Sequence, residues 1–267
     1  MGTVRLAIAG GGGRMGRALI DAAASSGDLH VACILEHPAS RLVGKDAGEL
    51  SVHCRGLPIR ADVAAAIPDA DVLIDFTRPE GTLAHLAACR AAGVRMVIGT
   101  TGFSDAQLEA IADASRDIAI VRAGNMSIGV NVTLKLVEQA TRALQGYDIE
   151  IIEAHHKMKV DAPSGTALML GDAAATALGC SLAEITAPVR QGHTGERKAG
   201  SIGFSSIRAG DIVGEHTVLF AGDGERVEIR HVATSRGNFA KGALAAARFL
   251  VGKPSGLFDM RDVLELN

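Results

Sequence analysis

A glycine run directly after the first strand-like segment constrains the fold of this chain more than any other feature. Residues 4–9 are mostly apolar, a pattern typical of a buried strand, and Gly11, Gly13 and Gly16 then satisfy Gly-x-Gly-x-x-Gly. A helix pattern follows at once. In such a unit the glycines allow a tight turn, close approach of a pyrophosphate to the backbone, and close packing of helix on strand. The pattern predicts a dinucleotide-binding unit.

The next strand pattern strengthens this prediction. Residues 29–35 form a second apolar segment, which ends at Glu36, 20 residues after Gly16. An acidic side chain at this place accepts hydrogen bonds from the ribose hydroxyls of NAD. The alternative is a glycine-rich turn in a doubly wound sheet that binds no nucleotide. Strand, glycines, helix, strand and acid in this order favour the cofactor site.

Strand and helix patterns continue to alternate along the first half. Further strands are expected at 71–77, 95–101 and 118–121, and Ser104 with Gln107 predicts a capping box that opens a helix. This alternation predicts a parallel sheet covered on both faces. Ligands of such sheets bind beyond the carboxyl ends of the strands. We therefore expect the turns at 99–101 and 123–126 beside the glycine loop, although ordinary turn chemistry also explains their composition. Residues 38–67 are expected to be loop-rich.

The second half has a different order of elements. Helices are expected at 127–144 and 167–178, and strands at 148–152, 201–207, 216–220 and 226–230, with a hairpin-like turn between the last two. This order predicts an α+β domain with a helix pair on a mostly antiparallel sheet. A final helix at about 239–251 is expected to return to the first domain.

The segment 153–166 carries the densest chemistry. It contains paired histidines, two lysines and a Pro-Ser-Gly-Thr helix opening, whose outward N–H groups suit a carboxylate or phosphate. In an extended segment His155, Lys157 and Lys159 share a face and His156 lies opposite. We therefore expect His155 and Lys159 to converge on one substrate. Histidine or lysine can meet the negative charge that builds up when a nicotinamide delivers a hydride.

This segment also has plainer interpretations. A bare His-His pair is more often a pair of satisfied histidines at a strand end, and only its neighbours favour catalysis. Adjacent histidines on a strand diverge, and no carboxylate–His pair has the helical spacing of metal ligands, so we expect no metal site. The Gly-Lys-Ser/Thr ending of a phosphate-binding P-loop is absent from Pro-Ser-Gly-Thr.

Composition narrows the classes of protein. No apolar run is long enough to span a bilayer, and a net charge of −3 argues against nucleic acid as the main partner. The four cysteines are scattered at 33, 54, 89 and 180, which is typical of reduced thiols. We expect a cytoplasmic protein with neither membrane nor nucleic-acid partners.

Several motifs together resemble the dihydrodipicolinate reductases, also called 4-hydroxy-tetrahydrodipicolinate reductases. The resemblance runs from the first strand to residues 256–262. Its most specific segments are Gly-Arg-Met-Gly at 13–16, Asp-Phe-Thr-Arg-Pro-Glu-Gly-Thr at 75–82, Val-Ile-Gly-Thr-Thr-Gly-Phe at 97–103, Glu-Ala-His-His at 153–156, and Ala-Pro-Ser-Gly-Thr-Ala at 162–167. Residues 192–197 and 208–216 match as well.

The resemblance implies an enzyme of the diaminopimelate route to lysine that reduces dehydrated 4-hydroxy-tetrahydrodipicolinate to tetrahydrodipicolinate with NADH or NADPH. It implies His155 as the acid/base and Lys159 as a proton donor. Three residues are implied to hold the carboxylates of this dicarboxylate substrate: His156, Gly165 and Thr166. The implied cofactor-binding residues are Gly10, Gly11, Gly12, Gly13, Arg14, Met15, Glu36, Gly99, Thr100, Thr101, Ala123, Gly124, Asn125 and Met126.

The resemblance also implies a homotetramer and two domains. Residues 1–126 plus 237–267 are expected to form a Rossmann-type dinucleotide-binding domain, and 127–236 a substrate-binding and oligomerisation domain. The sequence departs from the family pattern at His37, where members that accept NADPH often carry Arg, and at Met126, where an aromatic is common. A neutral imidazole lacks the bidentate fork that Arg offers a phosphate. Unless Arg41 substitutes, NADH is expected to serve at least as well as NADPH.

Two other functions remain open at this point. One is a different dehydrogenase on a similar plan, acting on an amino acid or a semialdehyde, although no cysteine lies in an evident nucleophile setting. The other is a non-catalytic sensor of NAD(H), which would have no use for His155 and Lys159.

Overall fold

The chain divides into two compact units. The computed structural model describes residues 3–187 and 189–266, so the terminal residues of the expected domains (1, 2 and 267) lie outside the described part. Among the described residues, one unit contains those up to Ile128 and those from Arg236 onward, and the other is Gly129–Ser235. The division expected from the sequence placed its two boundaries after residues 126 and 236. Each unit is described by itself.

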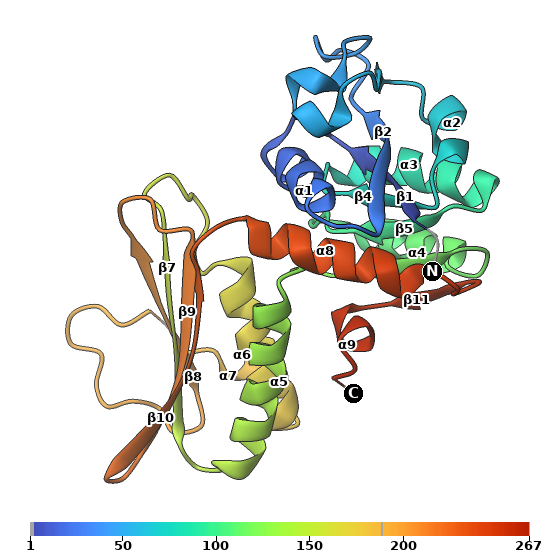
Figure 1. The fold of residues 1–267 in the computed structure, drawn as a ribbon. Coiled ribbons are helices and arrows are strands. Elements are labelled where there is room, and N and C mark those ends of the chain that lie inside the picture. Colours follow the sequence, from blue (N-terminus) through green and yellow to red (C-terminus); the bar gives the residue numbers. More distant parts are fainter. Residues whose placement is uncertain (1–2, 188, 267) are drawn as a thin grey trace. The chain divides into compact units, whose positions relative to one another are not determined.

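The first unit is built on a seven-stranded parallel sheet in the order β11-β6-β5-β4-β1-β2-β3 (Figure 1). Its strands are β1 (Val4–Ala9), β2 (Leu29–Leu35), β3 (Ile59–Arg60), β4 (Val72–Asp75), β5 (Arg95–Ile98), β6 (Ala119–Arg122) and β11 (Gly256–Phe258). The strand order reverses between β1 and β4, and all pairings are parallel. This confirms the predicted doubly wound sheet of Rossmann type.

Helices cover both faces of this sheet. They are α1 (Arg14–Ala24), α2 (Val63–Ala66), α3 (Pro79–Ala92), α4 (Asp105–Ala114), α8 (Gly237–Leu250) and α9 (Met260–Val263). Leu6 and Ile8 of β1 share one core cluster with α1 and α8. Ala7 and Ala9 point the other way, into a cluster with α2, α3 and α4. The alternation of a strand therefore divides its apolar residues between two layers of helix.

Short elements were the ones that sequence patterns did not predict. The loop-rich stretch 38–67 contains β3, α2 and the start of the 3₁₀ turn η3 (Ile67–Asp69), besides η1 (Ala47–Glu49) and η2 (Val52–Cys54). β11 pairs with β6 at the sheet edge. Two- and three-residue strands are too short for periodicity to reveal them. The predicted capping box of α4 is present, with Ser104 and Gln107 bonded reciprocally.

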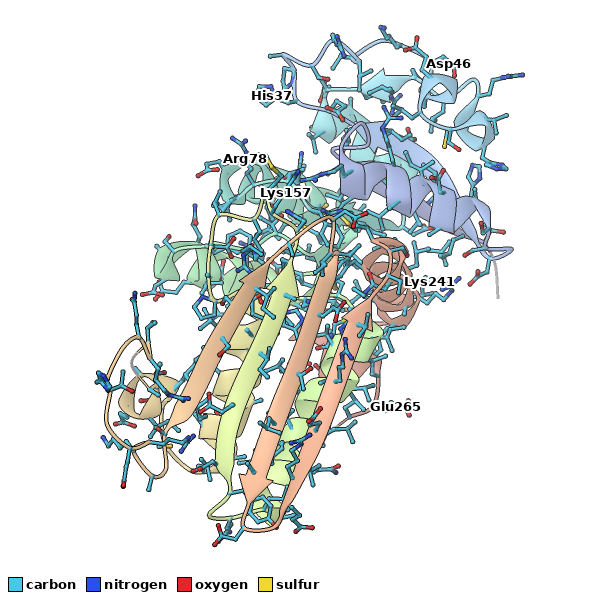
Figure 2. All side chains as sticks on the ribbon, turned by 90° about the vertical axis from the view of Figure 1, so that its left-hand side faces the viewer. His37, Asp46, Arg78, Lys157, Lys241 and Glu265 are labelled. Carbon is cyan, nitrogen blue, oxygen red and sulfur yellow. The ribbon has the colours of Figure 1, made fainter. Side chains whose placement is uncertain are left out.

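The second unit packs helices on one face of a four-stranded sheet (Figure 1). Its elements are α5 (Ile128–Ala143), β7 (Asp148–His155), α6 (Gly165–Ala177), α7 (Leu182–Ile185), β8 (Ile202–Arg208), β9 (Gly214–Gly222) and β10 (Glu225–Ala233). The strand order is β10-β9-β7-β8 (Figure 2). β9 is antiparallel to both β10 and β7, whereas β7 and β8 are parallel. The predicted α+β unit with a mostly antiparallel sheet is confirmed.

Strand β7 carries a buried carboxylate, Glu153. Ile149 and Ile151 are buried in one core cluster with residues of α5 and α6. Glu153 follows them on the same side of the strand and is only 1% exposed. A carboxylate thus occupies a position that the strand pattern reserves for an apolar side chain. No helix in the described part of the chain is both long and apolar enough to cross a bilayer.

Candidate active site

The glycine loop forms a tight turn between β1 and α1. Gly10 adopts φ 68°, and its N–H donates to the carbonyl of Leu35 at 2.8 Å. A Cβ on Gly16 would lie 2.3 Å from the carbonyl oxygen of Gly10, so α1 packs against the turn as only glycine allows. Gly13 is the N-cap of α1 and provides no side-chain cap. The first turn of this helix is therefore suited to an anion.

Glu36, at the end of β2, is bonded to the glycine loop. Its Oε1 accepts from the N–H of Gly12 at 2.7 Å, and Nε of Arg17 donates to the carbonyl of Gly12 at 3.2 Å. A Cβ on Gly12 would lie 2.3 Å from a methyl carbon of Leu42 and 3.0 Å from Oε1 of Glu36. The predicted acid and the predicted loop are thus brought together.

The other predicted cofactor residues lie at the same edge of the sheet. Gly99, Thr100 and Thr101 follow β5, and residues 123–126 follow β6. The carboxyl ends of parallel strands share one edge of a sheet, where β1 and β2 also end. Met126 is buried in the core cluster of α8, and a Cβ on Gly242 would lie 1.7 Å from its carbonyl oxygen.

A buried carboxylate that sequence reasoning missed organises the end of β4. Asp75 is 0% exposed and accepts from both the N–H and the hydroxyl of Thr77 at 2.7 Å. Its other oxygen lies 2.7 Å from Nδ1 of His85 on α3. The hydroxyl of Thr100 approaches Asp75 at 3.4 Å. This network ties β4, α3 and the turn after β5 together, and the resemblance motif 75–82 was its only sequence signal.

Two arginines of the first unit, Arg14 and Arg236, interact electrostatically. Burial lowers the pKa of Arg236, the N-cap residue of α8, and the charge of Arg14 at the start of α1 lowers it further. Neither forms an ion pair with any of the described residues. The positive potential of two such cations attracts anions.

Glu153 is the centre of the second unit's polar cluster. Arg208 of β8 donates to both its oxygens, at 2.8 and 2.7 Å, and Nδ1 of His155 lies 2.6 Å from Oε2. The N–H of Ser164 donates to Oε1 at 3.3 Å. Burial raises the pKa of Glu153, but hydrogen bonds from Arg208, Ser206 and His155 outweigh it and hold the pKa at about 2.

His155 ends strand β7 and is largely enclosed. Burial lowers its pKa, the hydrogen bond and charge of Glu153 act in the opposite direction, and the charges of Lys159 and Arg208 lower it further. Its Nε2 lies 3.1 Å from the position that a Cβ on Gly214 would occupy. The ring of His216 meets it edge to face, with centroids 5.2 Å apart.

His216 joins this cluster to the start of α6. Burial, followed by the charge of His155, lowers the pKa of His216 to about 4. Its Nε2 lies 2.8 Å from the hydroxyl of Ser164, the N-cap residue that accepts from the N–H of Ala167 at 3.1 Å. Next in the chain are Gly165, which is exposed, and Thr166, which is half-buried. The predicted helix opening is therefore joined to the Glu153 cluster, which also contains the predicted His155.

The expected alternation of His155, Lys157 and Lys159 on one face is wrong. Strand β7 ends at His155, and the N–H of Lys159 bonds the carbonyl of His156 at 3.1 Å in a turn. Nζ of Lys159 binds both oxygens of Asp161, at 2.8 and 2.7 Å. Its charge nevertheless acts on His155 and His216, so the turn brings Lys159 near them. Nδ1 of His156 is buried and has no partner among the described residues.

Four residues of this cluster have no role predicted from the sequence: Glu153, Arg208, Ser164 and His216. Three of these lie on neighbouring strands, because Glu153 pairs with His216 of β9 and His155 with Arg208 of β8. The available signals were a charged residue in the apolar phase of β7 and the resemblance motifs at 153–156 and 208–216. The pairing itself is non-local and has no signature in any single segment.

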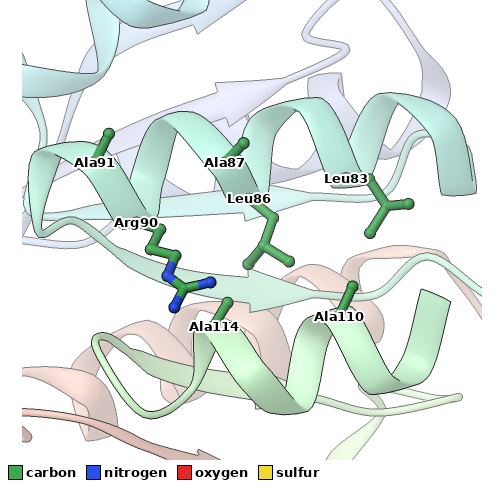
Figure 3. Close-up of a pocket in the computed structure, with 7 residues that line it drawn as sticks. All are labelled: Leu83, Leu86, Ala87, Arg90, Ala91, Ala110 and Ala114. Carbon is green, nitrogen blue, oxygen red and sulfur yellow. The ribbon is translucent and has the colours of Figure 1, made fainter. Parts of the chain in front are cut away.

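A separate apolar groove lies between α3 and α4, with a volume of about 520 Å³ (Figure 3). Leu83, Leu86 and Ala110 contribute to its lining. Arg90 at its rim is bonded to Asp113 and Asp117. None of the predicted site residues lines this groove, so it is not the candidate active site.

Comparisons with known proteins agree on one family. Residues 4–126 match the family model described as dihydrodipicolinate reductase, N-terminus, and 129–264 the model described as its C-terminus. The chain is 59% identical over 267 residues to a 4-hydroxy-tetrahydrodipicolinate reductase of Nitrosospira multiformis, covering 100% of this chain and 99% of that protein. It is 57% identical over 267 residues to one of Nitrosomonas eutropha, covering 100% of both chains. A dipicolinate-bound dihydrodipicolinate reductase from Paenisporosarcina sp. TG-14 superposes with TM-score 0.76 at 26% identity, covering 97% of this chain and 98% of that one.

Proposed function

The chain belongs to the dihydrodipicolinate reductase family, and from that premise we propose that it reduces 4-hydroxy-tetrahydrodipicolinate, in its dehydrated form, to tetrahydrodipicolinate with NADH or NADPH. The reaction is a step of diaminopimelate and lysine biosynthesis. The single observation that carries the proposal is 59% identity over the full length to a relative of that name. The proposal is supported independently by the chemistry of the glycine loop with Glu36 in the first unit and of the Glu153 cluster in the second.

The first unit suits a dinucleotide. We propose that the glycine loop, with residues 10–15, receives the pyrophosphate at the start of α1, and that Arg14 adds a cation there. Glu36 accepts from the adenosine ribose, because its carboxylate is already held at the loop. The turns 99–101 and 123–126 line the remainder of the cofactor. Glycine positions whose Cβ would strike neighbouring atoms at 2.3 Å support this fit. The bound NAD(P)H supplies a hydride.

The second unit supplies the proton. Hydride addition leaves the substrate with an extra electron pair, which a proton donor must meet. We propose His155 as the acid/base, because Glu153 orients its ring from the buried side. Lys159 lies near enough to act on the pKa of His155, and it serves as a further proton donor once substrate displaces Asp161.

Substrate carboxylates are proposed to bind at the start of α6. Gly165 and Thr166 form its first turn after the N-cap Ser164. Backbone N–H groups at a helix N-terminus favour anions. His156, whose Nδ1 is buried without a partner in the described structure, is proposed to face the same dicarboxylate.

We further propose a cytoplasmic homotetramer assembled through the sheet of the second unit. One face of that sheet is covered by α5 and α6, whereas Ile152, Ile207 and Val232 on the opposite side are 36%, 49% and 45% exposed. Apolar side chains gathered on an open sheet face favour association. All four cysteines are free, as in a reducing compartment.

The direct test is an assay of NADH and NADPH oxidation with substrate generated in place by the preceding synthase of the pathway. We expect cofactor oxidation that depends on every component and that yields tetrahydrodipicolinate mole for mole. Binding of NADH without substrate-dependent oxidation would contradict the proposed reaction and favour a sensor of NAD(H).

A further inference from the structure

Glu153 is an ionised carboxylate where the fold requires none. It occupies the covered face of β7 behind Ile149 and Ile151 and is 1% exposed. A buried ion pair is often no more stabilising than well-packed apolar residues of the same volume. The pair with Arg208 therefore calls for a role beyond stability. The chemistry of its neighbours indicates that role.

The first neighbour is the proposed acid/base. An ionised carboxylate only accepts hydrogen bonds, so the 2.6 Å contact requires the proton of neutral His155 to reside on Nδ1. The bidentate bonds from Arg208 keep the carboxylate ionised and hold it in one orientation. Nε2 is then the nitrogen that gains and loses a proton, and it is the ring atom nearest Gly214.

The second neighbour is the start of α6, the proposed binding site for the substrate carboxylates. Oε1 of Glu153 accepts from the N–H of Ser164, and His216 holds the hydroxyl of the same residue. Ser164 is the N-cap that precedes Gly165 and Thr166. One carboxylate therefore sets both the tautomer of His155 and the start of α6. Displacing the carboxylate of Glu153 would therefore misplace both the proton donor and the carboxylate-binding start of α6.

We propose that Glu153 and Arg208 are a positioning pair of the reaction, which fixes the tautomer of His155 and couples its ring to the N-terminus of α6. The inference rests on the proposed function and extends it to two residues that do not touch the reacting atoms. In the proton-transfer step the N–H bond at Nε2 of protonated His155 breaks and its electron pair stays on the nitrogen. The electron pair that hydride addition leaves on the substrate forms the new bond to this proton. Glu153 takes up no proton.

The test combines three variants with two readouts. Glu153→Gln removes the charge, Arg208→Lys keeps a cation but loses the bidentate fork, and Glu150→Gln is the matched control. Glu150 is another Glu of β7 bonded to arginine, but it lies on the opposite face of the strand. Nitrogen NMR of the ligand-free proteins reports the tautomer of His155. Steady-state kinetics report kcat and its pH profile, and fluorescence reports NADH binding.

Glu153→Gln should lower kcat by about 10- to 1000-fold, with NADH affinity unchanged, as for lost orienting partners of catalytic histidines. The His155 limb of its pH profile should move to lower pH, because Glu153 raises that pKa in the wild type. Its spectrum should show mixed tautomers. Arg208→Lys should lose less activity and keep the Nδ1–H form. Glu150→Gln should stay within twofold of the wild type.

Each contrary outcome is decisive. Unchanged kcat in Glu153→Gln, or lost activity with the tautomer and pH profile of the wild type, would overturn the positioning role. If Glu153→Gln does not fold, Arg208→Lys decides, and a wild-type kcat in that variant would contradict the proposal. If the wild type does not reduce the substrate, the proposed function is wrong. The tautomer of His155 in the free protein still tests the inference separately, and an Nε2–H tautomer would overturn it.

Discussion

The N–H of Gly12 donates to the carboxylate of Glu36 at 2.7 Å, so the acid at the end of β2 is fixed to the loop that follows β1. A carboxylate held there attracts ribose hydroxyls and repels a phosphate on the same ribose. His37, the next residue, accepts from the N–H of Ala39 through Nδ1 at 3.2 Å. In that arrangement it presents no guanidinium fork to a phosphate.

We therefore predict that NADH serves at least as well as NADPH, measured as kcat/KM with each cofactor. His37→Arg should raise kcat/KM for NADPH about 10-fold, since charge-assisted bonds to phosphate contribute roughly 1.5–3 kcal/mol. Arg41→Ala serves as the companion variant. A strong NADPH preference in the wild type that disappears in Arg41→Ala would show that Arg41 supplies the missing cation and would contradict the prediction.

Gly16→Ala should weaken both folding and cofactor binding. Alanine improves helix propensity by roughly 1 kcal/mol, but its Cβ would lie 2.3 Å from the carbonyl oxygen of Gly10 and 2.5 Å from Cα of Gly11. Backbone atoms can move only slightly to relieve such contacts, and overpacking lowers the free energy of unfolding by about 1–3 kcal/mol. We expect a net loss in the free energy of unfolding by urea and weaker NADH binding. Gly27→Ala, where a Cβ meets nothing within 4 Å, is the control.

The fold of the first unit was predictable because its signals are local. Each main signal lies within a few consecutive residues: the strand at 4–9, the glycines and the capping box at Ser104. Topology rules then predict how these elements are ordered. Strand β3 and strand β11 were missed because two or three residues carry no period. Their positions depend on pairing with β2 and β6.

The site was only half predictable for a related reason. His155, Lys159 and the helix opening at Ser164 are consecutive in sequence, so their proximity could be inferred. Arg208 and His216 reach the same point through β8 and β9, which no local pattern reveals. The turn after His155 was also missed, because an extended continuation of β7 fits the residue types equally well.

Gly214→Ala tests the space around the His155 ring. The added Cβ would lie 3.1 Å from Nε2, so the ring must shift by a few tenths of an ångström. Small displacements of a catalytic group are costly, and we expect kcat/KM to fall about 10-fold while NADH affinity is unchanged. Gly27→Ala again provides the control. Wild-type kcat/KM in Gly214→Ala would show that Nε2 does not act from this position.

His216 should make the second unit sensitive to mild acid. Its pKa falls from 6.5 to about 4 on folding, so the unfolded chain binds the proton more readily between these values. Stability is therefore lost as pH falls from 6.5 towards 4, by about 2 kcal/mol at pH 5. Urea unfolding of His216→Gln should show that much less change between pH 7 and pH 5. His30→Gln, at an exposed position, should behave as the wild type. Equal pH dependence in His216→Gln and the wild type would exclude His216 as the cause.

The most direct test of the proposed active site measures kcat and NADH dissociation constants for His155→Ala and Lys159→Ala beside the wild type. General acid–base groups contribute about 10²- to 10⁴-fold, so kcat should fall by at least 100-fold in each variant. NADH binding should stay within twofold, because both residues belong to the second unit and the glycine loop to the first. Turnover within about threefold of the wild type in both variants would contradict the account.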